Sequence, residues 1–356
     1  MQMTFRWFGA EKDTVSLNQI KQIPGVTGVV PALHYLPAGE AWQMDDVQRM
    51  YDEITASGLS MECIESVNVH EDIKIGLASR DKYIENYKTS IRSLSKVGVK
   101  VICYNFMPIF DWTRTDLYMK LPDGSTCLSY NGKQIEGKSP EDMFKEIDDN
   151  SNGYAMPGWE SERMGEIKDL FVKYKNVTAE DLWDNLKYFL ESIMPVCEEC
   201  DVKMAIHPDD PPWSIFGLPR IITDVNSIKR LLAMVDNKYN GITLCTGSLG
   251  CSADNDIVEI IKEAKGRIYF AHLRNISINE QWFNETAHIS EYGSLDMYKI
   301  VKALQENGFD GYIRPDHGRM IWGETARPGY GLYDRALGAT YLMGLWEAVS
   351  KGKGEK

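Results

Sequence analysis

VKMAIH at residues 202–207 and NGITLC at residues 240–245 are short apolar runs rich in β-branched side chains, and they predict two buried strands. Residues 223–236, which lie between them, show the spacing of apolar positions typical of an amphipathic helix. A strand, a helix and a second strand in this order predict a parallel βαβ unit. The same alternation continues in both directions along the chain.

Eight strand-then-helix units can be followed through the 356 residues. The predicted strands are 3–9, 26–30, 59–66, 99–106, 202–207, 240–245, 266–273 and 310–315. The predicted helices are 14–22, 44–58, 81–97, 178–200, 223–236, 252–264, 294–307 and 334–350. Barrel strands are covered by helices outside and by side chains within, which agrees with strands that are apolar on both faces. The pattern predicts an α/β fold, a (β/α)8 TIM barrel, with residues 1–356 forming a single domain.

Several predicted helices begin near residues that commonly cap a helix N-terminus. Thr178, supported by Asp181, is predicted to cap one of them. Thr223, Ser252 and Ser294 are predicted to cap three others.

Residues 107–177, after the fourth strand, are too long for an ordinary strand-to-helix loop and are predicted to be an insertion. DLYMKLPDGSTCLSY at 116–130 predicts a hairpin that turns at Pro122-Asp123-Gly124, and a helix is expected near 139–148. The insertion is expected to act as a lid, to make a dimer contact or to decorate the surface.

The composition restricts the possible partners. Acidic residues outnumber basic ones by 52 to 39, a formal charge of −13, and no long Lys/Arg run occurs, so neither nucleic acid nor an anionic membrane is expected as a partner. No apolar stretch of about 18 residues is present, and MQMTFRWFGAEKD at the start lacks the apolar core of a signal peptide. We therefore expect a cytoplasmic protein that acts on a small-molecule substrate. Its seven cysteines are expected to be reduced.

Four successive predicted strands end in residues that can bind a transition metal. The fifth ends in His207, the sixth in Cys245 and the seventh in His272, and the eighth leads into Asp316. Because the carboxyl ends of barrel strands meet at one rim, these four side chains are predicted to form a metal site. The alternative for each residue alone is a structural role in a hydrogen bond, the core or a turn.

Two further cysteines, Cys197 and Cys200, form a C-x-x-C pair late in a predicted helix. No second pair follows at a spacing typical of zinc ribbons, so a buried helix face is the better interpretation.

The loops beside the predicted metal ligands carry polar residues. Asp209 and Asp210 are expected either to accept hydrogen bonds from a ligand imidazole or to cap a turn. His317 follows Asp316 directly, and Tyr330 lies in a Pro-Gly-Tyr turn. Imidazole and phenol can both transfer protons.

The first four strands and the insertion supply candidates for substrate binding. Guanidinium groups bind carboxylates through two parallel hydrogen bonds, so four arginines are candidates for an anionic substrate, with at least two of them expected in ion pairs instead. The complete set of predicted substrate-binding residues is Arg6, Trp7, His34, Glu65, His70, Asn105, Arg114, Arg274 and Arg314.

Nine motifs along the chain together resemble the mannonate dehydratases of hexuronate catabolism. They are RWFG (6–9), GVVPALHYLPAGEAW (28–42), ESVNVHEDIK (65–74), CYNFMPIFDWTRTDL (103–117), HPDDPPWSIFGLPR (207–220), TLCTGSLG (243–250), FAHLRN (270–275), RPDHGR (314–319) and PGYG (328–331). The resemblance extends from the first predicted strand to the last.

The resemblance implies a xylose-isomerase-like barrel that converts D-mannonate to 2-keto-3-deoxy-D-gluconate and water in glucuronate catabolism, with Mn²⁺ or Fe²⁺ as cofactor. It implies the ligand set His207, Cys245, His272 and Asp316, which the strand ends already indicated. It also implies proton transfer by His317 and Tyr330 and suggests a homodimer.

Three points stay open at this stage. The donor set by itself would favour zinc, whereas the resemblance implies manganese or iron. A metal-dependent sugar or sugar-acid isomerase or epimerase on the same barrel is an alternative function, although such sites seldom contain cysteine. A metal-stabilised sugar-acid-binding protein without turnover is a third possibility.

Overall fold

The computed structural model describes residues 1–136, 138, 142, 145, 164–279 and 282–352. Within them, eight parallel strands follow the order β2-β1-β12-β9-β8-β7-β4-β3, and a parallel bridge between Gly28 and Ser60 brings the two edges of the sheet together. The strands are β1 (Gln2–Arg6), β2 (Val26–Val30), β3 (Cys63–Glu65), β4 (Val101–Tyr104), β7 (Lys203–Ile206), β8 (Asn240–Cys245), β9 (Ile268–His272) and β12 (Tyr312–Arg314). The predicted (β/α)8 barrel and its eight strands are confirmed.

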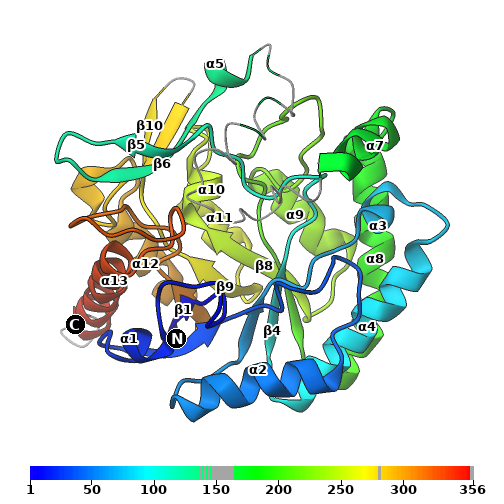
Figure 1. The fold of residues 1–356 in the computed structure, drawn as a ribbon, viewed down its shortest axis with the longest axis horizontal. Helices are drawn as coiled ribbons and strands as arrows, with labels where there is room; N and C mark the ends of the chain where they lie inside the picture. Colours follow the sequence, from blue (N-terminus) through cyan, green and yellow to red (C-terminus); the bar gives the residue numbers. More distant parts are fainter. Residues whose placement is uncertain (137, 139–141, 143–144, 146–163, 280–281, 353–356) are drawn as a thin grey trace.

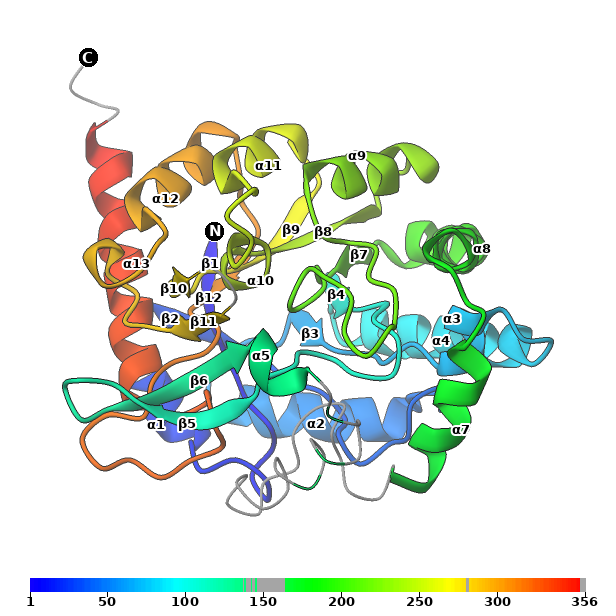
Figure 2. The ribbon, with the colours of Figure 1, turned by 90° about the horizontal axis from the view of Figure 1, so that it is seen from above.

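Helices surround the strands (Figure 2). Those that correspond to the eight predicted helices are α1 (Leu17–Lys21), α2 (Met44–Ala56), α4 (Arg80–Lys96), α8 (Ala179–Cys200), α9 (Val225–Met234), α11 (Ile257–Glu263), α12 (Met297–Glu306) and α13 (Tyr333–Gly352). Three shorter elements, α3 (Glu71–Ile75), α10 (Thr246–Gly250) and the 3-10 turn Ser290–Tyr292, were not predicted. Among the described residues, no helix combines the length and apolar character that crossing a membrane requires.

One of the four predicted helix caps is confirmed. The Thr178 hydroxyl accepts a hydrogen bond from the Asp181 backbone N–H at 3.1 Å and begins α8. The other three helices begin one to four residues later than predicted, at Asp224, Asp256 and Asp296 instead of Thr223, Ser252 and Ser294. In each of them a carboxylate oxygen accepts a hydrogen bond from an N–H of the first turn, which satisfies a backbone donor that the helix leaves unpaired.

A second sheet of four antiparallel strands, called the accessory sheet here, has the order β10-β11-β6-β5. Its strands are β5 (Asp116–Lys120), β6 (Thr126–Asn131), β10 (Ile276–Asn279) and β11 (Trp282–Glu285). The predicted hairpin is confirmed as β5 and β6, and Gly124 takes the positive φ of 85° that its turn needs. The hairpin of β10 and β11 was not predicted, because its strands have only four residues each and mix polar with apolar side chains.

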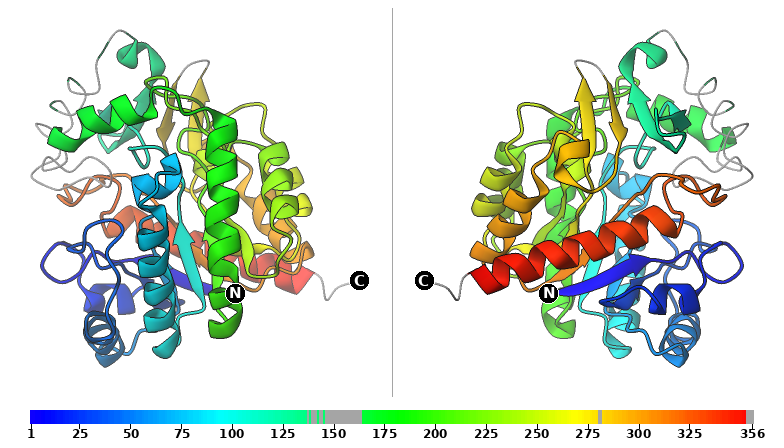
Figure 3. Two further views of the ribbon diagram at one scale, coloured as in Figure 1. Left: turned by 90° about the vertical axis from the view of Figure 1, so that its right-hand side faces the viewer. Right: turned by 90° about the vertical axis from the view of Figure 1, so that its left-hand side faces the viewer.

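The accessory sheet lies at one end of the barrel (Figure 3). Figure 1 places α10, which follows β8 directly, toward the same end, so the sheet lies on the side of the carboxyl ends of the strands. The insertion 107–177 contributes β5, β6, α5 (Gly132–Ile135) and α7 (Met164–Tyr174). The helix predicted near 139–148 lies almost wholly outside the described residues.

The position of the α11 cap gives a first prediction. Asp256→Ala removes the acceptor for the Val258 and Glu259 N–H groups, so the free energy of unfolding should fall by about 0.5–2 kcal/mol. Ser252→Ala, which changes the cap expected from sequence, should alter it by less than about 0.5 kcal/mol. Urea unfolding measures both, and an equal loss in the two variants would contradict the assignment of the cap.

Candidate functional site

The four predicted metal ligands lie together at the carboxyl rim of the barrel. Nε2 of His207 is 3.1 Å from Nδ1 of His272, and one donor atom from each of His207, Cys245 and His272 lies within 4.8 Å of the other two. The Asp316 carboxylate is 3.6 Å from both the Cys245 Sγ and the His272 Nδ1. Two nitrogen ligands of one cation lie roughly 3 Å apart, so the arrangement fits a metal ion.

Neighbouring groups hold the two imidazoles in position. Nδ1 of His207 is 2.7 Å from the Pro208 carbonyl, to which it can only donate, so Nε2 is left with a lone pair toward the cluster. Nε2 of His272 is 3.3 Å from the Glu65 carboxylate, and its Nδ1 faces the cluster. A carbonyl or carboxylate partner on the far nitrogen is the usual way in which proteins orient a metal-binding histidine.

Asp316 has a backbone conformation that is uncommon for a residue with a side chain, with φ at 61°. The conformation is supported from several directions. Arg314 Nη2 and Arg274 Nε lie 2.7 and 2.9 Å from the two carboxylate oxygens. His288 Nε2 lies 2.6 Å from the Pro315 carbonyl just before it. The surrounding contacts therefore determine where this carboxylate points.

The charges of the cluster suit a cation. Burial opposes ionisation of the Cys245 thiol, but Arg274 and His207 outweigh it and lower the pKa of Cys245 to about 5. Burial likewise opposes ionisation of Asp316, whereas His317 and Arg314 hold its pKa well below the ordinary value. At neutral pH the cluster therefore presents a thiolate and a carboxylate. Burial opposes protonation of His207, but the Cys245 thiolate raises the pKa of His207 to about 9, so this ring has to release its Nε2 proton when a cation binds.

His317 and Tyr330, the two predicted proton-transfer residues, contact each other directly. His317 Nε2 is 2.9 Å from the Tyr330 hydroxyl, and both side chains are buried. Phe8 packs edge-on against the Tyr330 ring, and Trp112 packs edge-on against His317. Burial raises the pKa of the Tyr330 phenol above its ordinary value, although Arg314 opposes the shift, so the phenol keeps its proton at neutral pH.

A network of four buried charged residues supports this pair. Arg114 binds both carboxylate oxygens of Asp210, at 2.7 and 3.1 Å, and Arg274 binds one of them at 2.7 Å. Glu285 pairs with both arginines through Oε1. Burial disfavours the charged carboxylate, but Arg114 and Arg274 hold the pKa of Asp210 well below its ordinary value. Arg114 and Arg274 are thus engaged in ion pairs, and Arg314 pairs with Asp316 and Glu65, so three of the four arginines are ion-paired, which agrees with the expectation of at least two.

Four other predicted substrate-binding residues, Arg6, His34, Glu65 and Arg314, lie at the barrel mouth. Arg6 donates to the Val30 carbonyl at 2.8 Å and to His34 Nε2 at 3.2 Å. Arg314 pairs with Glu65 through Nη2 at 3.1 Å; its Nε and Nη1 are buried and have no hydrogen-bond partner among the described residues. Arg6 and Arg314 are therefore the arginines placed to meet an anionic substrate.

The remaining predicted residues have other contacts. His70 caps α3 through Nδ1 and stacks on the Tyr83 ring at 3.6 Å. Asn105 accepts from the Met107 N–H and donates to Asp111, so it organises the loop after β4. Trp7 is buried. The contacts of His70 and Asn105 are structural, whereas Trp7 Nε1 is buried and has no hydrogen-bond partner among the described residues, so substrate binding by Trp7 stays a prediction.

Asp209 and Asp210 had two predicted roles. Asp209 accepts hydrogen bonds from the Ile221 and Ile222 N–H groups at 2.6 and 3.0 Å. It therefore stabilises the loop backbone, which is closer to the predicted turn-capping role than to a contact with a ligand imidazole. Asp210 instead pairs with arginines, a role that neither alternative described. Cys197 is fully buried in α8, as expected for a helix face, whereas Cys200, the last residue of the helix, is only half-buried.

Sequence reasoning missed several members of the site. They are Ser248, Glu285, His288 and Arg327. Ser248 follows Cys245 by three residues in α10, and its hydroxyl contacts both Cys245 Sγ and Asp210 at 3.0 Å. Ser248 could have been found from the sequence, because it lies in the TGSLG segment directly after Cys245. Glu285 could not, because it lies in a hairpin that was not predicted.

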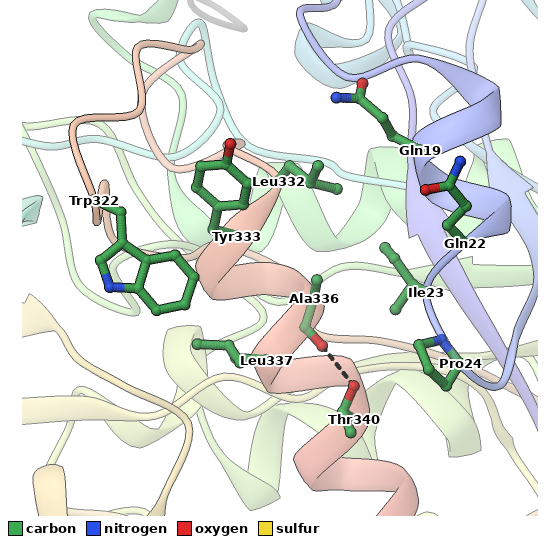
Figure 4. A pocket seen from close by; sticks show the side chains of 10 residues that line it. All are labelled: Gln19, Gln22, Ile23, Pro24, Trp322, Leu332, Tyr333, Ala336, Leu337 and Thr340. Atoms are coloured by element: carbon green, nitrogen blue, oxygen red, sulfur yellow. Dashed lines mark hydrogen bonds between the residues drawn. The ribbon is translucent and has the colours of Figure 1, made fainter.

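A separate groove of about 280 Å³ lies between α1 and α13, where Trp322 and Tyr333 project from the loop and helix (Figure 4). Its ten lining residues include no imidazole, thiol or carboxylate. It therefore lacks the side chains that usually bind a transition metal.

Fold and rim together define a (β/α)8 barrel protein with a candidate metal centre beside a candidate proton-transfer pair. Solved structures of this kind resemble the chain at low identity, including a D-tagatose 3-epimerase-like protein (TM-score 0.53, 10% identity, 99% of both chains), which supports the fold alone. The family model of D-mannonate dehydratase (UxuA) matches residues 1–356. The chain belongs to the D-mannonate dehydratase family, a family of hydro-lyases.

Individual relatives agree with this membership. The mannonate dehydratase of Thermotoga neapolitana is 59% identical over 356 residues, covering 99% of each chain. That of Geobacillus thermodenitrificans is 58% identical, covering 99% of this chain and 96% of its own. The crystal structure of mannonate dehydratase from Streptococcus suis serotype 2 is 46% identical with a TM-score of 0.91, covering 100% of this chain and 97% of that one.

Gly247 gives a prediction about the packing of the site. A Cβ at this position would lie 2.1 Å from Arg274 Nε, inside the charged network. Gly247→Ala should therefore lower the free energy of unfolding by about 1–3 kcal/mol. Gly344→Ala, in α13 with no atom near the added Cβ, should raise it by about 0.5–1 kcal/mol. Urea unfolding measures the free energy of unfolding of both variants. A Gly247→Ala variant as stable as the unmodified protein would contradict the tight packing around Arg274.

Proposed function

We propose that this protein removes water from D-mannonate to give 2-keto-3-deoxy-D-gluconate. The observation that carries the proposal is the meeting of a His/Cys/His/Asp cluster with the hydrogen-bonded His317–Tyr330 pair at one barrel rim, in a chain of the D-mannonate dehydratase family. Arg274 links the two groups, because it contacts both Asp316 and His317.

Four residues would hold the cation: His207, Cys245, His272 and Asp316. Burial, the ionised thiol and the oriented imidazoles support this set. A bound divalent cation supplies Lewis-acid stabilisation of the charge that develops beside the substrate carboxylate. We propose Mn²⁺ or Fe²⁺ as the physiological ion, and zinc is the alternative that the donor atoms also suit.

The proposed proton-transfer roles follow from the protonation of His317 and Tyr330: the phenol holds a proton that it can donate, and the imidazole Nε2 can accept one. Dehydration breaks the C2–H bond beside the carboxylate and the C3–O bond, and the resulting enol becomes the 2-keto product. We propose that His317 Nε2 accepts the C2 proton and that the Tyr330 phenol protonates the departing C3 hydroxyl. The 2.9 Å contact between them lets the imidazolium return its proton to Tyr330 after turnover.

The substrate carboxylate is proposed to bind Arg6 and Arg314. Arg327 and Arg6 both pack over the Phe8 ring, so these two guanidinium groups lie close together. Like charges and burial lower the pKa of Arg6, burial being the larger cause. An incoming carboxylate relieves this repulsion, which favours an anionic sugar acid over a neutral sugar.

The oligomeric state and the cellular location of the protein are also proposals. A homodimer is expected, and sedimentation equilibrium measures it. A cytoplasmic location is expected, and cell fractionation measures it.

The first test is the identity of the product. Protein incubated with D-mannonate and Mn²⁺ should give a 2-keto acid that reacts with semicarbazide and that NMR identifies as 2-keto-3-deoxy-D-gluconate. Recovery of an epimer or a ketose would favour the isomerase or epimerase alternative. Binding of mannonate without any product would favour a binding protein.

A pair of variants separates metal binding from proton transfer. Cys245→Ala should lose most of the bound metal and the activity, because it removes the thiolate. Tyr330→Phe should keep its metal and lose at least about 10²-fold in kcat, the typical contribution of a general acid. Elemental analysis beside steady-state kinetics measures both, and a Tyr330→Phe variant with near-normal kcat would refute the assigned role.

The proposed carboxylate contact predicts a change in KM. Arg6→Gln should raise KM for mannonate at least tenfold, because a charge-assisted contact contributes about 1.5–3 kcal/mol. Arg230→Gln, which breaks an exposed ion pair with Glu180, should leave KM unchanged. Initial-rate kinetics tests the pair, and equal KM values for Arg6→Gln and the unmodified protein would remove Arg6 from the substrate site.

A further inference from the structure

We propose that Glu285 is a positioning residue that selects the tautomer of His317, and that the accessory sheet delivers it to the barrel rim. The proposal deepens the proposed function and rests on it, because it explains how His317 keeps Nε2 free to accept a proton. Among the described residues, Glu285 makes no hydrogen bond to a candidate metal ligand; it acts through His317 and the two arginines.

The contact between Glu285 and His317 determines where the imidazole carries its hydrogen. Glu285 Oε1 lies 2.7 Å from His317 Nδ1, and both side chains are buried. Burial opposes ionisation of Glu285, but His317, Arg274 and Arg114 lower its pKa, so it is a carboxylate that can only accept hydrogen bonds. Nδ1 must therefore carry the hydrogen. In a neutral ring, Nε2 then has the lone pair and accepts from the Tyr330 hydroxyl.

Arg274 makes this selection necessary. Its Nη1 lies 2.8 Å from the same Nδ1 and can only donate. While Glu285 is present, Nδ1–H and Arg274 Nη1 both donate to Oε1. Without that acceptor, Arg274 would donate to a bare Nδ1, and the ring hydrogen would move to Nε2. The Tyr330 hydroxyl would then have to accept a hydrogen bond from Nε2–H, and Nε2 could no longer accept a proton.

Glu285 reaches His317 because of the accessory sheet. It is the last residue of β11, which pairs with β10 on one side and with β6 of the insertion on the other. Arg114, just before β5, donates to the same Oε1 at 3.1 Å. The sheet thus brings the carboxylate and one of its cations from two separate segments to one imidazole.

The alternative is that Glu285 only neutralises Arg114 and Arg274. Two substitutions distinguish the roles, because all three donors converge on Oε1, and Oε2 has no hydrogen-bond partner among the described residues. Glu285→Gln loses the charge but can keep a carbonyl oxygen at Oε1, with its amide at the unpartnered position. Glu285→Leu loses both the charge and the acceptor.

A tautomer-selecting role predicts unequal losses. Glu285→Gln should keep kcat within about tenfold, whereas Glu285→Leu should lose about 10²–10⁴-fold, the range for a misoriented catalytic imidazole. KM should change by less than about threefold in both. Asn284→Ala, the neighbouring buried polar residue of β11, is the matched control and should keep kcat within about threefold. Equal losses in the Gln and Leu variants, or an equal loss in the control, would overturn the proposal.

A second measurement reads the tautomer without turnover. The chain has six histidines, so ¹⁵N-histidine NMR of the protein loaded with diamagnetic Zn²⁺, with a His317→Gln sample for assignment, can report which nitrogen is protonated. The unmodified protein should show Nδ1–H, and Glu285→Leu should show Nε2–H. An Nε2–H signal in the unmodified protein overturns the proposal even if the Leu variant does not fold. If the tautomers agree but mannonate gives no product, the proposed function fails and the positioning role stands.

Discussion

The buried pairing of Arg114 and Arg274 with Asp210 and Glu285 is the interaction on which the rest of the site depends. A buried charge without a partner is strongly destabilising, so none of the four groups can lie where it does unless the others are in place. They come from the insertion, the loop after β7, the end of β9 and the accessory sheet. Their pairing therefore holds the accessory sheet against the barrel mouth and fixes the geometry of the rim.

Arg274 extends this constraint into the candidate metal centre. Its Nε contacts Asp316, its Nη2 is 3.9 Å from Cys245 Sγ, and its Nη1 contacts Glu285. One guanidinium thus favours the ionised forms of a thiol and two carboxylates. Buried ion pairs of this kind contribute little net stability relative to apolar packing, but they restrict side-chain orientation, and orientation is what a catalytic rim requires.

The alternation of strands and helices was predictable because it reflects local patterns. The strand ending in Cys245 and the helix capped by Thr178 are each encoded within about ten residues of sequence. The convergence of the four candidate metal ligands was predictable for a related reason: parallel strands place their carboxyl ends at one rim, so residues at the strand ends lie close together. The cap of α11 was misplaced because serine and aspartate both cap helices, and only backbone geometry shows that Asp256 does so.

Sequence alone determined the barrel, its eight strands and the chemical types at its rim, since periodicity and strand ends are properties of short segments. Tertiary structure alone decided which carboxylates each arginine pairs with and that Arg314 keeps two buried N–H groups without a hydrogen-bond partner among the described residues. It also decided that Glu285 reaches His317 at all, 32 residues away in the chain. The physical reason is that an ion pair depends on distance and burial, and segments as far apart as Arg114 and Glu285 acquire both only when the chain has folded.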